Sequence, residues 1–310
     1  MISIQSCRDD GLLPAKNDLL KSKLSQYAIY QGNISNLQPT NGYHLYELST
    51  ELFTDYAEKQ RLVKIPEGKT MIPSGDGLPD FPDGTTLVKT FYYYRDMRDT
   101  SKGKNCVETR ILVKKDQQWS AGTYLWNSDQ TDANLITSGL NKTINWIDSQ
   151  GNGKVISYQV PNERACASCH NANNSTFPIG PKLRNLNRDV LRNNELVNQL
   201  QHLHSEGIMD QVEPTTIHKL PEWDNPKFSL EERARAYLEV NCAHCHNNQG
   251  FASGIKLRFS YELSLEESRI ANNKADIKNR MTRGEMPKIG TTIIHQEGLS
   301  LIKEYMENLK

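Results

Sequence analysis

The pattern of apolar and polar positions divides the chain into a β-rich part followed by a helical part. Between residues 41 and 160, runs rich in β-branched and aromatic side chains alternate with clusters of glycine, proline and aspartate. Such runs predict β-strands, and the clusters between them predict tight turns. The clearest strand candidates are residues 86–94, 108–114 and 155–160. The pattern therefore predicts an antiparallel β domain, built as a sandwich or a barrel.

From Pro161 onward the apolar residues follow a helical period. Three leucines at helical spacing occupy residues 196–203, and apolar residues at similar spacing occupy residues 299–309. Residues 229–232 read Ser-Leu-Glu-Glu, which is a capping box at the start of a further expected helix. We therefore predict an all-α region after the β domain, with a linker at residues 221–226.

Composition narrows the classes of protein that the chain can represent. It contains 37 basic and 37 acidic residues, so its formal net charge is zero. This balance gives no reason to expect a nucleic-acid partner. No apolar run is long enough for a transmembrane helix, so none is expected in the chain as given.

Two Cys-x-x-Cys-His pentapeptides are the most specific chemical signal in the sequence. In such a motif two thiols add to the vinyl groups of a haem, and the histidine ligates the iron. A zinc site is the alternative, but it would bring two thiol pairs around one metal and does not need a histidine directly after the second cysteine. The motifs predict two covalently bound c-type haems, held by Cys166, Cys169, His170, Cys242, Cys245 and His246.

The second axial ligand of the second haem is expected from a Gly-Glu-Met-Pro segment near the last helix. Met286 in this segment is the leading candidate for an iron ligand opposite His246, and Met281 is the alternative. A methionine or histidine in that position closes the iron for electron transfer. An ordinary role in core packing is the competing interpretation for any methionine.

The surroundings of the first haem are less sharply defined by the sequence. Pro181 follows His170 at a distance where a proline carbonyl accepts the imidazole N–H in class I cytochromes, so it is a candidate cofactor-binding residue. Met209 is the leading candidate for the sixth ligand of this iron. The alternatives are an open site, a ligand from another part of the chain, or one of His202, His204 and His218.

Two cysteines remain outside the haem motifs. Cys7 follows a small residue near the start of the chain, an arrangement that resembles the end of a bacterial lipoprotein signal. On that interpretation Cys7 carries a lipid anchor, and the protein is an outer-membrane lipoprotein. A disulfide between Cys7 and Cys106, or two free thiols, is the alternative. Haem attachment takes place outside the cytoplasm, so the expected location is the periplasm or the cell surface.

Several segments together resemble one family of bacterial proteins. They are residues 52–57, 89–91, 108–110, 124–127 and 233–246. These segments are similar to the bacterial dihaem c-type cytochromes first named from a Shewanella protein, a family of conserved hypothetical proteins. The resemblance covers the chain from about residue 40 to its end and implies a secreted or lipid-anchored redox protein. It supports the architecture more than any particular biochemical role.

These observations predict a multidomain α+β protein. Residues 1–40 form a leader, 41–160 the β domain, 161–225 the first haem module and 226–310 a second, cytochrome c-like haem module. The expected function is one-electron transfer in the cell envelope between redox partner proteins. A dihaem peroxidase or oxidase with one open haem site is the alternative, and a ligand-binding sensor is a third class.

Overall fold

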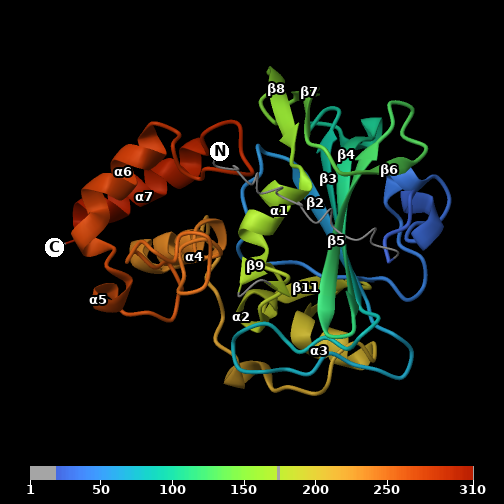
Figure 1. The fold of residues 1–310 in the computed structure, drawn as a ribbon, viewed down its shortest axis with the longest axis horizontal. Helices are drawn as coiled ribbons and strands as arrows, with labels where there is room; N and C mark the ends of the chain where they lie inside the picture. Colours follow the sequence, from blue (N-terminus) through green and yellow to red (C-terminus); the bar gives the residue numbers. More distant parts are fainter. Residues whose placement is uncertain (1–18, 173–174, 310) are drawn as a thin grey trace, which may run out of the picture.

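A six-stranded antiparallel sheet forms the centre of the protein (Figure 1). The computed structural model describes residues 19–172 and 175–309. Each strand of the sheet pairs with the strand that precedes it in the sequence. The strands are β1 (His44–Leu45), β2 (Glu58–Lys64), β3 (Thr86–Tyr94), β4 (Lys104–Lys115), β5 (Gln118–Trp126) and β6 (Ala133–Ile136).

Hairpins and short helices surround this sheet. The hairpins are β7 (Leu140–Ile147) with β8 (Gly153–Val160), β9 (Asn171–Ala172) with β10 (Ser175–Thr176), and β11 (Asp189–Arg192) with β12 (Glu195–Asn198). The α-helices are α1 (Glu163–Cys169), α2 (Leu183–Leu186), α3 (Gln199–Ser205), α4 (Leu230–Asn241), α5 (Leu265–Ser268), α6 (Lys274–Thr282) and α7 (Gln296–Asn308). Short 3₁₀ turns are η1 (Leu24–Tyr27), η2 (Ile34–Asn36), η3 (Thr100–Lys102), η4 (Pro214–Thr216) and η5 (Ala271–Asn273).

The prediction of an all-α dihaem cytochrome c region after the β domain is wrong. The structure is mostly β, and the hairpins β9–β10 and β11–β12 lie inside the segment expected to be helical. Leu196, expected on a helical face, is on β12 with its side chain 72% exposed. The cause is the turn at Asn193 and Asn194, whose φ angles of +51° and +66° suit a two-residue hairpin turn. This turn reverses the chain before a helix can form.

The two faces of the central sheet pack against different parts of the chain. Side chains alternate between faces along each strand. One face carries Leu62, Val88 and Ile111, which form an apolar core with the N-terminal segment that contains η1 and η2. On the other face Val63 and Leu87 join a second core with residues of α2 and α3. This second face is the one turned toward α1.

The C-terminal helices form a further apolar core beside the sheet. Helix α7 packs against α4 and α6. Figure 1 shows α1 between the sheet and α4. In the described part of the chain, no helix has both the length and the apolar character that crossing a bilayer requires.

Candidate functional site

The two Cys-x-x-Cys-His motifs meet between the sheet and helix α4. The first motif occupies the C-terminal end of α1, where the Cys166 sulfur lies 3.9 Å from the Thr123 hydroxyl on β5. The second motif begins at Cys242, directly after α4. The sulfurs of Cys169 and Cys245 and a ring nitrogen of His244 all lie within 4.8 Å of one another. The fold therefore brings together two motifs that are far apart in the sequence.

The contact between the two motifs changes the acidity of their thiols. Because the Cys169 and Cys245 thiols hydrogen-bond to each other, the pKa of Cys245 is lowered and that of Cys169 is raised. Cys242 packs against the apolar core of the C-terminal helices, and its burial raises its pKa to about 12. The Nδ1 atom of His244 is buried and has no hydrogen-bond partner among the described residues.

His170 is oriented for coordination through its outer nitrogen. Its Nδ1 lies 2.9 Å from the Phe177 carbonyl oxygen, which can only accept a hydrogen bond. Nδ1 therefore carries the proton, and Nε2 presents a free lone pair. Burial, together with charge repulsion from Arg110 and Lys89, lowers the pKa of His170 to about 4. The imidazole is neutral at physiological pH, as a metal ligand must be.

His170 lines a cavity of about 220 Å³. The sheet contributes Arg61, Lys89 and Arg110 to one wall of this cavity, and residues 177–182 contribute another. His244, from the second motif, lines the same space. Imidazoles from both motifs therefore reach one cavity.

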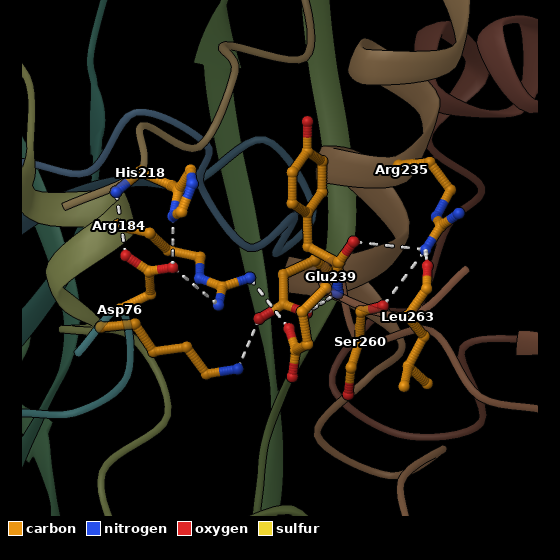
Figure 2. A network of polar contacts seen from close by, with 10 residues as sticks. Asp76, Arg184, His218, Arg235, Glu239, Ser260 and Leu263 are labelled. Atoms are coloured by element: carbon orange, nitrogen blue, oxygen red, sulfur yellow. Dashed lines mark hydrogen bonds and ion pairs between the residues drawn. The ribbon is translucent and has the colours of Figure 1, made fainter. Parts of the chain in front are cut away.

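A polar network connects the segment after the first motif to the loop around residue 76 (Figure 2). Asp76 accepts hydrogen bonds from the backbone N–H and the Nδ1 of His218, at 2.9 and 2.8 Å. Arg184 lies between Asp76 and Glu262, and its guanidinium donates to the Glu262 carboxylate at 2.9 Å. These contacts join α2 to Asp76 in the loop before β3 and to Glu262 in the segment after the second motif.

The same network continues to helix α4 (Figure 2). The Glu239 carboxylate accepts from the Lys182 ammonium and, at 2.8 Å, from the Tyr261 backbone N–H. Arg235 donates to the backbone carbonyls of Ser260 and Leu263. Helix α4 is therefore attached to the segment after the first motif and to the loop after the second.

Met286 and His246 lie in different surroundings. Met286 lines a second cavity, of about 80 Å³, together with Met281, Tyr237 and His295. His246 is not in the lining of that cavity; its ring packs edge-on against Phe259, with centroids 5.2 Å apart. His295 was not among the residues that the sequence singled out, because nothing in its local pattern marks it.

Of the residues that the sequence suggested around the first haem, only some line the cavity that contains His170. Pro181 lines the cavity, although the acceptor for the His170 N–H is the Phe177 carbonyl. Met209 is fully buried in the core formed by the sheet, α2 and α3, and is not in the cavity lining. Neither are His202, His204 and His218.

His244 lines the same cavity as His170, whereas Met209 and the three other histidines do not. It occupies a variable position of its own motif, so no sequence rule draws attention to it.

The remaining cysteines are only partly visible in the structure. Cys106 is fully buried on β4, with its sulfur 3.9 Å from the Ser35 carbonyl oxygen. Cys7 lies outside the described residues. The lipid anchor and the disulfide therefore both stay predictions.

Comparisons with protein-family models, curated proteins and solved structures found no match for this chain. The resemblance to bacterial dihaem cytochromes therefore stays a prediction from sequence motifs.

Proposed function

We propose that the protein is a dihaem c-type cytochrome that transfers single electrons in the bacterial cell envelope. The observation that carries this proposal is the presence of two Cys-x-x-Cys-His motifs in one chain. The fold brings them close together, with His170 of one and His244 of the other lining one cavity. Two haems attached at sites this close could exchange electrons directly, without a further electron carrier between them. Redox partner proteins would supply and accept the electrons.

The residues present fit c-type haem. Cys166 and Cys169 lie three positions apart on α1, so both face the same side of the helix. His170 follows them with its Nε2 free and its Nδ1 fixed by the Phe177 carbonyl. When bound, haem iron supplies one-electron chemistry, with properties tuned by its axial ligands and by hydrogen bonds around it. The second motif offers the same set of groups in Cys242, Cys245 and His246.

A zinc site is the second candidate, and one observation favours it. Cys169, Cys245 and His244 offer two sulfurs and one nitrogen within 4.8 Å, which are ligand types that zinc prefers. Such a site would leave the other four groups of the motifs without a role. Haem attachment uses both thiols and the histidine of each motif, which is why we prefer it.

The first experiment measures which cofactor the chain holds. The protein is produced in bacteria that export it and attach c-type haem, and is analysed by its pyridine haemochrome spectrum, intact mass and zinc content. We expect two thioether-linked haems per chain and no stoichiometric zinc. A double C166A/C169A variant should retain one haem. A wild-type protein that contains zinc and no haem would overturn the proposal.

The peroxidase or oxidase alternative depends on the sixth ligand of the first haem. Met209, His202, His204 and His218 are all absent from the lining of the His170 cavity, which favours an accessible iron. His244 in that cavity favours a closed one. Carbon monoxide added to the reduced protein separates these cases. An unchanged visible spectrum supports electron transfer alone, and a shift in one haem makes peroxide turnover the next assay.

A further inference from the structure

Three cations lie side by side across the central sheet. In the strand register Arg61 on β2 is opposite Lys89 on β3, and Lys89 is opposite Arg110 on β4. We call these three residues the cationic row. Like charges in directly opposite positions destabilise a sheet. Strand pairing alone therefore does not favour the three neighbouring cations, and another role must account for them.

The cationic row lies between an apolar part of this sheet face and a part where Lys59 and Glu108 flank Phe91. Two residues further along each strand, Val63, Leu87 and Leu112 are also opposite one another, and they pack into the core with α2 and α3. On that side, the charged row borders the apolar core directly. Such a conflict between a residue type and its surroundings is typical of functional positions.

The counter-charges available to the row do not cover all of it. Arg61 pairs with Glu51 at 2.8 Å, and Arg110 pairs with Glu108 at 2.6 Å. The Lys89 ammonium forms no ion pair or hydrogen bond with any residue in the described part of the chain. Its neighbour is an aromatic ring, that of Phe91, whose centroid lies 4.7 Å away. Burial lowers the pKa of Lys89, and the cations beside it lower that pKa further.

The row faces the cavity that contains His170. Arg61, Lys89 and Arg110 all line it, and the complete lining has five cationic side chains and one carboxylate. The two other cations, Lys182 and Arg184, already pair with acidic residues of the network in Figure 2. Among the described residues, Lys89 is therefore the one cation of this lining that has no acidic partner within ion-pair distance.

The row also has a fixed relation to the first haem motif. Arg110 is opposite Thr123 on β5, and Thr123 contacts the Cys166 sulfur. With strands about 4.8 Å apart, Lys89 lies roughly 10 Å from β5 along the sheet. One end of the row thus adjoins a haem-attachment thiol, and the rest extends away from it along the cavity wall.

We propose that Lys89 and Arg61, the part of the cationic row away from Cys166, form a carboxylate-binding site, and that its ligands are the propionate groups of the haem attached at Cys166 and Cys169. This inference rests on the proposed function. The Lys89 ammonium supplies a point charge, and the buried Arg61 Nη2, which has no hydrogen-bond partner among the described residues, can donate beside it. The proposal explains why a β-sheet accompanies the motifs, because the sheet holds the charged groups while α1 holds the thiols.

The test compares K89M with wild type in two forms of the protein. In the haem-loaded form, removal of a cation near the first iron should lower the reduction potential of one haem and leave the other unchanged. It should also lower the thermal midpoint. In the C166A/C169A background, which lacks the first haem, K89M should instead raise the thermal midpoint, because it removes a half-buried cation that has no acidic partner.

The matched control is K59M. Lys59 is also a half-buried cation, on β2, but it pairs with Glu51 at 3.5 Å and does not line the cavity. K59M should leave both reduction potentials unchanged. If K89M shifts stability in the same direction in both forms and leaves the potentials unchanged, the row is structural and the proposal is wrong.

A second arm separates haem propionates from a free carboxylate. Succinate is added to the C166A/C169A protein and to the haem-loaded protein, and the thermal midpoint is followed. The proposal expects succinate to stabilise only the form that lacks the first haem, and only with Lys89 present. Equal stabilisation of both forms would assign the row to a free anion and overturn the propionate assignment. A chain that never acquires haem refutes the proposed function, whereas a Lys89-dependent response to succinate would still identify a carboxylate site.

Discussion

Two half-buried histidines in this protein are held neutral by their surroundings. Burial lowers the pKa of both His170 and His295 to about 4. His295 is stacked on Phe53 with ring centroids 4.1 Å apart, and its Nδ1 lies 3.1 Å from the Tyr237 hydroxyl. Removal of water around His295 disfavours its protonated form in the folded state. The negative charge of the nearby Glu297 favours that form but offsets the effect of desolvation only in part.

The pKa of His295 makes stability depend on pH. The unfolded imidazole titrates near 6.5 and the folded one at about 4, so the unfolded state binds more protons between these values. The contribution of His295 to the free energy of unfolding is fully present above the pKa of the unfolded state. It decreases as the pH falls toward the pKa of the folded state. From about pH 7 to about pH 5, His295 should account for a loss of about 2 kcal/mol.

Urea unfolding at the two pH values measures this loss. The variants H295Q and H295F should both be less stable than wild type near neutral pH and should show a smaller change on acidification. An equal pH dependence in wild type and in both variants would show that His295 does not titrate as expected.

At the scale of elements, helix α4 shows how a local signal becomes a defined structure. Ser229 accepts a hydrogen bond from the backbone N–H of Glu232, and the Glu232 carboxylate accepts from the backbone N–H of Ser229. This is the capping box expected from the sequence, and the helix begins where it predicts. The helix leads directly into Cys242, so its start fixes the position of the second motif.

Removal of this cap should destabilise the protein. S229A leaves helix N–H groups without a partner, and the expected loss is about 1 kcal/mol in the free energy of unfolding. E232Q is the matched control, since glutamine also completes a capping box and should cost less. Urea unfolding compares the two. The role given to the cap would be wrong if S229A and E232Q proved equally stable.

Helix α7 approaches α4 closely at Gly298. A Cβ atom at this position would lie 2.4 Å from the ring of Tyr237 on α4. G298A should therefore separate the helices, and we expect a net loss of about 1–3 kcal/mol despite the higher helix propensity of alanine. S300A, at an exposed position of the same helix, should be neutral or slightly stabilising. Thermal unfolding of both variants tests this, and an unchanged midpoint in G298A would contradict the close contact.

The elements that the sequence predicts correctly are those with local causes. Residues 86–94 form β3, and the expected strands at 108–114 and 155–160 lie within β4 and β8. The final expected helix corresponds to α7. Alternation, capping and helical spacing each act over a few residues, so one segment is enough to recognise them.

The features that the sequence does not reveal depend on pairing between distant segments. The spacing of Leu196, Leu200 and Leu203 fits a helix, but only the last two lie in α3, because short apolar runs also fit a hairpin strand. Arg61 and Lys89 become neighbours only through the strand register. The place of His244 beside Cys169 likewise depends on how α1 and α4 pack.

At the scale of the whole molecule, a few buried polar contacts attach the sheet side to the C-terminal helices. The Asn241 side chain, next to the second motif, accepts a hydrogen bond from the Phe53 backbone N–H at 2.9 Å. Asp55 accepts from the backbone N–H groups of Thr292 and Ile293 and from the Thr292 hydroxyl. These bonds position residues 284–295, which contain Met286 and His295.

A substitution at Asp55 tests this attachment. D55N keeps a residue type that tolerates the φ of +53° at this position, but it replaces one acceptor oxygen with a donor. We expect a loss of about 1–3 kcal/mol and faster hydrogen exchange at the amides of Thr292 and Ile293. D116N is the control, because Asp116 also has a positive φ but lies exposed in a turn. Unchanged exchange at both amides in D55N would show that the carboxylate does not hold this segment.

The order of the strands in the central sheet has a consequence for how the chain folds. Because each strand pairs with the one before it, the sheet needs no crossover and grows by successive closures of loops, the longest being residues 65–85 between β2 and β3. The bonds from Phe53 to Asn241 and from Asp55 to Thr292 close far longer loops, whose entropic cost is greater. The sheet is therefore expected to assemble early in folding, and the two Cys-x-x-Cys-His motifs are expected to reach each other in one of the last steps.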